Sequence, residues 1–201
     1  MEQIYSNTER RDDERHVPGE PAFWIFIVGE MAMFGFMYLV FLCYRFWTPE
    51  NLLIFEAGQR TLSQFYGALN TVLLLTSSWF IVLGLKAARK GNASEGKVFV
   101  KLTFMCGLGF VFVKVFEYAE KIQSGYLLNT DAFYQIYYMY TILHLMHVLA
   151  GLTALIYLIK NCFKDDCRDP NNVAIIEGVA SFWHLVDLLW IGLFTLIYLM
   201  V

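Results

Sequence analysis

Charged side chains are scarce in this sequence. Asp, Glu, Lys and Arg make up 16% of the 201 residues, hydrophobic residues make up 58%, and the mean hydropathy is +0.49. Soluble globular domains contain about 25% charged and about 45 to 50% apolar residues. This composition excludes an ordinary soluble domain. No basic run is interleaved with aromatic residues in the manner of a nucleic-acid-binding protein. The sequence therefore indicates a protein that crosses a membrane several times.

Cysteine and histidine are also rare, with four of each. Cys43 and Cys106 lie inside apolar runs, whereas Cys162 and Cys167 share one polar segment, so the four do not form a disulfide framework. The spacing from Cys162 to Cys167 is not that of a CxxC motif, and no histidine in that segment could complete a zinc site. We expect ordinary thiols and no metal bound by this chain.

Long hydrophobic runs are what the sequence has in abundance. A helix rises about 1.5 Å per residue and the hydrocarbon core is about 30 Å thick, so about 20 apolar residues span it. Five runs meet this length: Ala22 to Tyr44, Gln64 to Leu85, Val98 to Tyr118, Phe133 to Ile159 and Ile175 to Val201. We predict an all-α, polytopic bundle of five transmembrane helices in one domain, residues 18–201, after a polar tail, residues 1–17.

Polar residues separate the runs and predict where the helices end. We expect loops at residues 86–97 and 161–172, which carry Gly, Pro, Asn and charge. All four prolines lie at or outside the expected helix ends, which predicts straight, unbroken spans: Pro18, Pro21, Pro49 and Pro170. Nothing in residues 1–20 resembles a cleavable signal, since that segment has no apolar core of its own.

Lys and Arg are distributed unevenly between the two ends of the expected bundle. Eleven belong to the tail and the two polar connections with their flanks: Arg10, Arg11, Arg15, Lys86, Arg89, Lys90, Lys97, Lys101, Lys160, Lys164 and Arg168. Only Arg45, Arg60 and Lys121 lie at the opposite end. Cytoplasmic loops of membrane proteins carry the excess of Lys and Arg. We therefore predict a cytoplasmic N-terminus and an external C-terminus.

Two further patterns concern packing. Small residues, among them Gly67, Gly107, Gly151 and Gly178, mark where transmembrane helices can approach closely. Tyrosines crowd the start of the fourth run and indicate an aromatic belt at the membrane surface: Tyr134, Tyr137, Tyr138 and Tyr140. Both patterns are structural and do not by themselves indicate a function.

Seven polar side chains lie at membrane depth: Glu30, Lys114, Glu117, His144, His147, His184 and Asp187. A charged acid there costs at least about 2.5 kcal/mol, so Glu30 should face other helices and be mostly protonated. Lys114 and Glu117 are three residues apart and predict an ion pair. His144 and His147 have the same spacing, and so do His184 and Asp187, so each pair shares one helix face. We expect one hydrogen-bonded network that links the last three helices: Glu117, His144, His147, His184 and Asp187.

These residues also permit other interpretations. A haem would need two facing histidines, which His144 or His147 with His184 could supply. A membrane two-iron enzyme would need more histidines than the sequence contains. A solute transporter would show interrupted helices and inverted repeats, and neither is visible. Glu30 could bind protons, although no relay of acids crosses the membrane.

Four motifs in order resemble subunit III of the haem-copper oxidase superfamily. The first run, FWIFIVGEMAMFGFMYLVF, is similar to the family's acid-bearing span; FEYAE is similar to its FEY motif. HLMHVLAG resembles the paired-histidine motif, and SFWHLVDLLWIGLFTLIYL resembles the terminal WHFVDxxWxxLF signature. By this resemblance, the acid of the first span is Glu30 and that of FEY is Glu117. His144 and His147 are the paired histidines, and His184 and Asp187 are the WHxxD pair.

The resemblance implies a five-helix accessory subunit without a redox centre or catalytic residue of its own. Haem and copper or iron would belong to its partner, catalytic subunit I of a haem-copper oxidase or nitric oxide reductase. Bound phospholipid, support of proton uptake and a bacterial cytoplasmic membrane are also implied. The PGEPAFWIF start, a short connection and the length of 201 residues resemble NorE-type proteins of nitric oxide reductase. The alternative is subunit III of an aerobic cytochrome c or quinol oxidase. Lys114 matches neither branch.

Overall fold

The computed structural model of this chain describes residues 21–163 and 169–200, which are helical over most of their length and contain no strand. The elements are α1 (Pro21–Phe46), α2 (Pro49–Thr61), α3 (Gln64–Lys90), α4 (Ala93–Gln123), α5 (Ala132–Tyr157) with the π-helical turn η1 (Leu158–Cys162), and α6 (Pro170–Phe194) with the π-helical turn η2 (Thr195–Leu199). The all-α prediction is confirmed. The expected tail, with His16, and residues Lys164, Cys167 and Arg168 lie outside the described residues.

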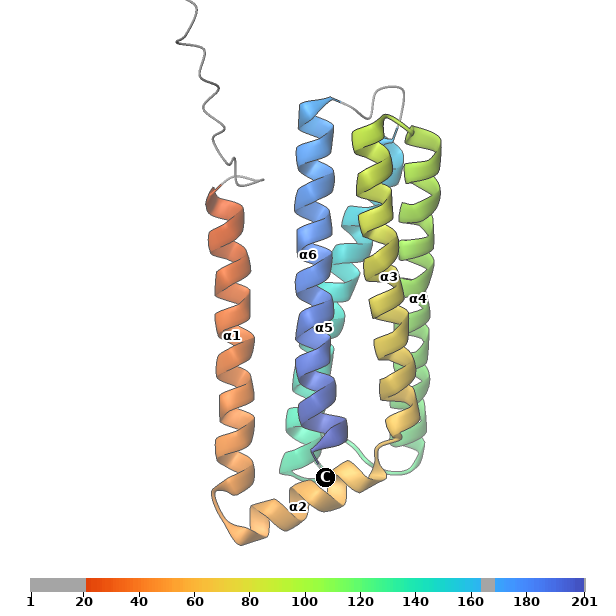
Figure 1. Cartoon of the computed structure of the whole chain (residues 1–201). Helices are drawn as coiled ribbons and strands as arrows, with labels where there is room; N and C mark the ends of the chain where they lie inside the picture. Colours follow the sequence, from red (N-terminus) through yellow and green to blue (C-terminus); the bar gives the residue numbers. More distant parts are fainter. Residues whose placement is uncertain (1–20, 164–168, 201) are drawn as a thin grey trace, which may run out of the picture.

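Five of these helices are long and apolar enough to cross a membrane, with mean hydropathies of 1.7 to 2.1 over their most apolar windows. They are α1, α3, α4, α5 with η1, and α6 with η2. Helices α3 to α6 run side by side as a bundle, α1 stands at its edge, and α2 crosses one end (Figure 1). The chain is thus a multi-pass membrane protein, as expected.

The helices extend beyond the apolar runs that predicted them. The expected loop at residues 86–97 is a turn at Gly91 and Asn92 only, because Lys86–Lys90 and Ala93–Lys97 are helical. Gly91 has a φ of 81°, the left-handed conformation that glycine adopts without a steric penalty, and its N–H bonds back to α3. Apolar side chains mark the part of a helix inside the membrane, whereas backbone hydrogen bonds let the helix continue past it.

The sequence analysis predicted no helix between the first two spans, and α2 corrects it. Thr48 caps this helix by accepting a hydrogen bond from the Asn51 N–H, and Pro49 opens its first turn. The helix is short and amphipathic, so it lacks the long apolar run that identifies a span. Arg45 at the end of α1 donates to Gln59, and Lys121 at the end of α4 donates to the Thr61 carbonyl. These two cations fasten α2 to the bundle.

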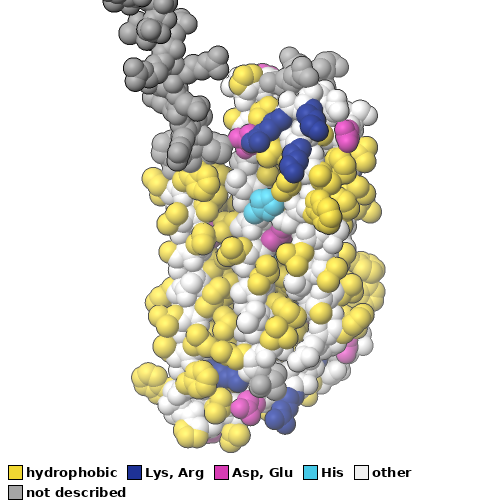
Figure 2. Space-filling view, in the orientation of Figure 1, with side chains coloured by type: hydrophobic (Ala, Val, Ile, Leu, Met, Phe, Trp, Pro, Cys, Tyr) yellow, Lys and Arg dark blue, Asp and Glu magenta, His cyan; other side chains and the backbone are white. Residues whose placement is uncertain are grey.

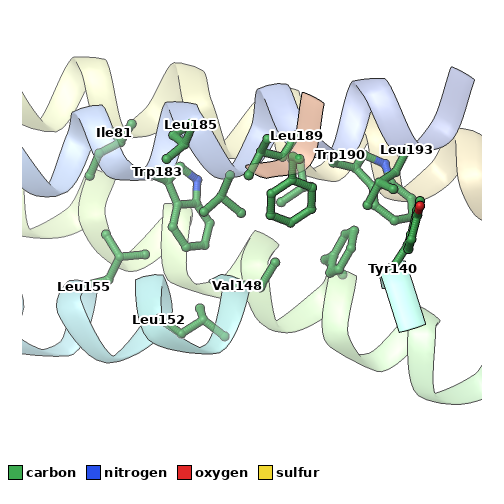
Figure 3. Packing of buried hydrophobic residues seen from close by; sticks show 14 of the residues in the cluster. Ile81, Tyr140, Val148, Leu152, Leu155, Trp183, Leu185, Leu189, Trp190 and Leu193 are labelled. Atoms are coloured by element: carbon green, nitrogen blue, oxygen red, sulfur yellow. The ribbon is translucent and has the colours of Figure 1, made fainter. Parts of the chain in front are cut away.

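The core of the bundle is built around two tryptophans of α6 (Figure 3). Trp183 donates its indole N–H to Ser77 Oγ at 2.8 Å, and Trp190 donates to Thr71 Oγ1 at 3.1 Å. Both acceptors lie on α3, so each ring buries its apolar surface while its polar edge finds a partner. The indoles therefore fix how α6 sits against α3.

Glycines make room for these aromatic side chains. An added Cβ at Gly107 or Gly151 would lie within 2.8 Å of Trp183 atoms, and one at Gly67 within 2.7 Å of Phe194. The prediction of close approach is confirmed at these three positions. It is wrong at Gly178, where an added Cβ would meet nothing within 4 Å.

Substitution of Gly151 tests this packing. In Gly151→Ala the new methyl would lie 2.7 Å from Trp183 Cε3. Overpacking of a close-packed interior costs about 1 to 3 kcal/mol, so we expect a lower midpoint of thermal unfolding in detergent. Gly178→Ala is the matched control, since alanine in open space should preserve or raise helix stability by up to roughly 1 kcal/mol. Equal midpoints for the two variants would contradict the proposed contact.

Candidate functional site

Among the described residues, the most buried charges are Lys114 and Glu117 on α4. Lys114 Nζ lies 3.0 Å from Glu117 Oε2, and the two side chains are 1% and 0% exposed. The ion pair expected from their spacing is confirmed. Desolvating two charges costs several kcal/mol per ion, which their attraction repays only where further hydrogen bonds surround them.

Aromatic residues supply those further contacts. The Tyr198 hydroxyl accepts a hydrogen bond from Lys114 Nζ at 2.8 Å and donates one to Glu117 Oε1. The Tyr137 hydroxyl donates to the same Oε1 at 3.0 Å. Lys114 Nζ also lies 5.0 to 5.5 Å from the centres of four rings, those of Tyr118, Tyr137, Trp190 and Tyr198. Such distances allow cation–π attraction. We call Lys114, Glu117 and these four residues the lysine cage; it ties together α4, α5, α6 and η2.

The four tyrosines at the start of α5 do not form the expected belt at the membrane surface. All four are buried, and each hydroxyl finds a partner inside the protein: Tyr134 with Thr61, Tyr137 with Glu117, Tyr138 with the Tyr126 carbonyl and Tyr140 with the Met37 carbonyl. The belt prediction is therefore wrong. Tyrosine at a helix end suits either the membrane surface or an interior with acceptors, and sequence position does not distinguish them.

Glu30 pairs with His147 across the contact between α1 and α5. Glu30 Oε2 lies 3.0 Å from His147 Nε2, and the side chains are 18% and 14% exposed. His147 Nδ1 lies 2.8 Å from the Leu143 carbonyl oxygen, which can only accept, so Nδ1 carries a proton. One further proton then lies between Nε2 and the carboxyl oxygen. Whichever atom holds it, the pair as a whole is neutral, which suits membrane depth.

Two more hydrogen bonds hold α1 against the bundle. The Tyr38 hydroxyl donates to the Leu189 carbonyl of α6 at 2.7 Å, and the Tyr140 hydroxyl of α5 donates to the Met37 carbonyl at 2.6 Å. In the most apolar window of α1 only 17% of residues are buried, against 50% in α6. Packing at Ile27, Phe34 and Phe41, which are buried in the core, and these polar contacts together hold α1 in place.

The remaining candidate residues make separate contacts. His144 is buried between the rings of Phe110 and Trp190, and neither of its nitrogens has a hydrogen-bond partner. His184 is exposed, with Nδ1 2.5 Å from Ser78 Oγ of α3. Asp187 is buried near Ser78, yet neither of its carboxylate oxygens accepts a hydrogen bond. The expected network through Glu117, His144, His147, His184 and Asp187 is therefore wrong.

Helix geometry explains that error. Side chains three residues apart differ in direction by about 60° around the axis, enough to face different neighbours. His144 points at the interior whereas His147 reaches α1, and His184 faces outward whereas Asp187 is buried. The partners that do complete the sites are Tyr137, which the sequence pattern assigned to the belt, and Tyr198 and Ser78, which belong to residue types too common in the sequence to attract notice.

This geometry does not support the haem interpretation, which needs two histidines that face each other. His144 is enclosed by Phe110 and Trp190, whereas His184 lies at the surface. Across residues 21–163 and 169–200, no three His, Cys, Asp or Glu side chains gather where they could hold a metal ion. Within these ranges Cys43, Cys106 and Cys162 are free thiols.

Substitutions in the lysine cage should show strong coupling. In Glu117→Gln, Lys114 keeps its charge in a buried site without a counter-charge, and such a loss typically costs about 3 to 5 kcal/mol. We expect the double variant Lys114→Met with Glu117→Gln to be more stable than Glu117→Gln alone, because it removes the isolated charge. Thermal unfolding of the purified chain measures the two single variants, Glu117→Gln and Lys114→Met, and the double variant. Additive effects would show that the two residues do not act as a pair.

Glu30 should tolerate one substitution and not another. In Glu30→Gln the side-chain amide can donate to a neutral His147 Nε2, so we expect the contact with α5 and the thermal stability to be preserved. Glu30→Ala removes the partner of His147 and leaves a void beside it, for which we expect a loss of about 1 to 3 kcal/mol. Thermal unfolding in detergent compares the two. Equal losses would contradict a neutral pair.

The known proteins that this chain resembles are subunits of haem-copper oxidases. The sequence pattern of the family described as cytochrome c oxidase subunit III matches residues 21–201. A haem-copper oxidase subunit I+III of Aeropyrum pernix is 28% identical over 89% of this chain and 22% of its own length. A probable cytochrome c oxidase subunit 3 of Mycobacterium bovis is 33% identical over 64% of this chain and 63% of its own.

A cytochrome bo(3) ubiquinol oxidase subunit 3 of Pseudomonas aeruginosa is 26% identical over 89% of this chain and 83% of its own length. This chain therefore spans most of that relative, under two thirds of the mycobacterial one, and about a fifth of the Aeropyrum protein. The matched region begins at the first residue of α1 and takes in all five membrane helices and α2. With its fold and its sequence pattern in agreement over this region, the chain belongs to the cytochrome c oxidase subunit III family.

Proposed function

We propose that this chain is an accessory membrane subunit that binds the catalytic subunit I of a respiratory haem-copper enzyme. It would support the assembly, stability and proton uptake of that subunit in a bacterial cytoplasmic membrane, and it would hold no redox centre of its own. The observation that carries the proposal is the family match over residues 21–201, together with a relative whose name joins subunits I and III. A subunit that can be part of the same chain as its partner is suited to direct contact with it.

The geometry of the polar residues is consistent with an accessory role. Lys114 and Glu117 are enclosed by aromatic rings, and Glu30 is bound by His147, so these groups connect helices. A structural role of this kind suits a protein that must hold a rigid shape beside a partner.

The partner enzyme belongs to one of two classes. The sequence at the start of the first helix resembles that of NorE-type proteins, which favours a nitric oxide reductase. The relatives from Mycobacterium bovis and Pseudomonas aeruginosa are named as subunits of a cytochrome c oxidase and a ubiquinol oxidase, which favours an aerobic oxidase. The catalytic partner itself, once isolated, distinguishes the two.

A bound phospholipid is a second element of the proposal. A groove of about 310 Å³ runs between α1, α5 and α6, lined by Phe23, Ala154, Ile175, Gly178, Val179 and Phe182. Its walls are apolar, and Gly178 leaves space where a side chain would otherwise stand. An acyl chain is the ligand that such a groove would accept within a membrane.

Isolation from the native membrane tests the proposed function. We expect affinity purification of the chain in mild detergent to recover a haem-bearing catalytic subunit in equal amount, identified by mass spectrometry. Whether that catalytic subunit reduces oxygen or nitric oxide then decides between the two classes of partner enzyme. Recovery of the chain alone after lipid-preserving extraction would refute the proposal. A Soret band in that isolated chain, or uptake into vesicles containing only it, would then favour a free-standing haem-binding or solute-moving protein.

A further inference from the structure

His184 lies at the surface within the apolar run of the last span. It comes nine residues after Ile175, where that run begins, and seven after Glu177, which places it roughly 10 to 14 Å along the helix from that end at 1.5 Å per residue. Ser78, its partner on α3, is seven residues before Leu85, where its own apolar run ends. Figure 2 shows histidine and acidic side chains on a face that is otherwise largely hydrophobic at this height.

An exposed imidazole at this depth is unfavourable next to lipid. Ser78 engages Nδ1, whereas no partner within the described residues is recorded for Nε2. Acyl chains can neither donate nor accept a hydrogen bond, and ionisable residues in transmembrane helices almost always face protein or water.

The side chains around His184 form a continuous strip. On α6, Leu188, Ile191 and Thr195 follow His184 at intervals of four, three and four residues, and all are exposed. On α3, Leu75, Ser78 and Val82 follow one another at intervals of three and four. These spacings place each set on one side of its helix, and the contact from Ser78 to His184 brings the two sets together. We call these seven residues the α3–α6 surface.

A different face of the bundle has no polar centre. The groove along α4 measures about 530 Å³ and is lined by Met105, Leu108, Gly109, Val111, Phe112 and Val115. None of these side chains has a hydrogen-bonding group that needs a partner. The α4 face therefore suits acyl chains, whereas the α3–α6 surface combines apolar side chains with a polar centre.

We propose that the α3–α6 surface is where the catalytic subunit docks, through a membrane helix whose polar side chain reaches His184 Nε2. This inference rests on the proposed function, because it takes the partner from there. In such an interface the apolar side chains provide the contact area, and the one buried hydrogen bond fixes how the two helices are aligned. The partner helix would cover Leu75, Leu188 and Ile191 and provide the hydrogen bond that lipid cannot.

Site-directed photocrosslinking tests the location. A photoreactive phenylalanine analogue replaces Leu75 or Leu188, which are 49% and 54% exposed, or Met105, which is 61% exposed. Met105 is the matched control, since Thr103 bonds to the Ser77 carbonyl and so places Met105 near the depth of Leu75 on the other face. The labelled chains are irradiated in native membranes before purification. We expect a covalent product with the catalytic subunit when the analogue replaces Leu75 or Leu188. We expect no such product when it replaces Met105.

A second measurement addresses the polar contact. His184→Ala should weaken retention of the catalytic subunit about two- to tenfold, the effect of one hydrogen bond of about 0.5 to 1.5 kcal/mol, while Met105→Ala leaves it unchanged. The amount of each variant in the membrane controls for folding. Unchanged retention in His184→Ala at normal abundance would contradict the polar contact.

The outcomes separate this inference from the proposed function. If the wild-type chain purifies with a catalytic subunit but only Met105 crosslinks to it, the docking surface is wrong and the accessory function stands. Crosslinks from Leu75 or Leu188 to a second copy of the chain, or to lipid alone, also overturn the surface. If the wild-type chain recovers no catalytic subunit, the proposed function fails and the inference fails with it.

Discussion

Hydrocarbon offers no hydrogen bonds, and the ion pair of Lys114 with Glu117 is where that constraint acts most strongly on this fold. Two buried charges on α4 cannot rely on water, so the protein surrounds them with hydroxyl groups and aromatic faces. Those groups come from α5 and from α6 with its continuation η2. Tyr198 lies near the end of the last span and bonds to both charges, so the final helix must extend far enough, and at the correct angle, to complete the cage. The relative positions of three helices follow from one ion pair.

Helix α1 is held by a different kind of interaction. It buries little surface, and its polar contacts are the neutral pair of Glu30 with His147 and two tyrosine hydroxyls that bond to backbone carbonyls. A backbone carbonyl that already accepts a helical hydrogen bond still has a second lone pair available. Tyr38 can therefore fix α1 against α6 without breaking the α6 ladder, and Gly192 opposite its ring allows the approach. The result is a compact four-helix bundle with a fifth helix fastened at a few points.

The sequence predicted the number of spans, the ion pair and several sites of close helix approach, because each depends on local spacing or on composition. Glu117 three residues after Lys114 must lie near it on any helix, and Gly151 can accommodate Trp183 only because it lacks a side chain. Properties that depend on tertiary neighbours could not be predicted. Whether Tyr137 lies at the membrane surface or bonds to Glu117, and whether His147 reaches α1 or the bundle interior, depends on how helices rotate against one another. Helix α2 was missed because a short amphipathic helix resembles a polar connection when only apolar runs are counted.

The polar residues singled out by the sequence divide into two groups once their partners are known. Lys114, Glu117, Glu30 and His147 are satisfied within this chain, so their presence is explained by the fold alone. His144, His184 and Asp187 are not: both nitrogens of His144 and both carboxylate oxygens of Asp187 are buried without a hydrogen bond, and His184 is exposed on the side of the bundle. Retaining such groups costs free energy in an isolated protein. Of the three, only the exposed His184 can recover that cost at a contact with a partner, which is why the proposed docking surface is centred on it, between α3 and α6.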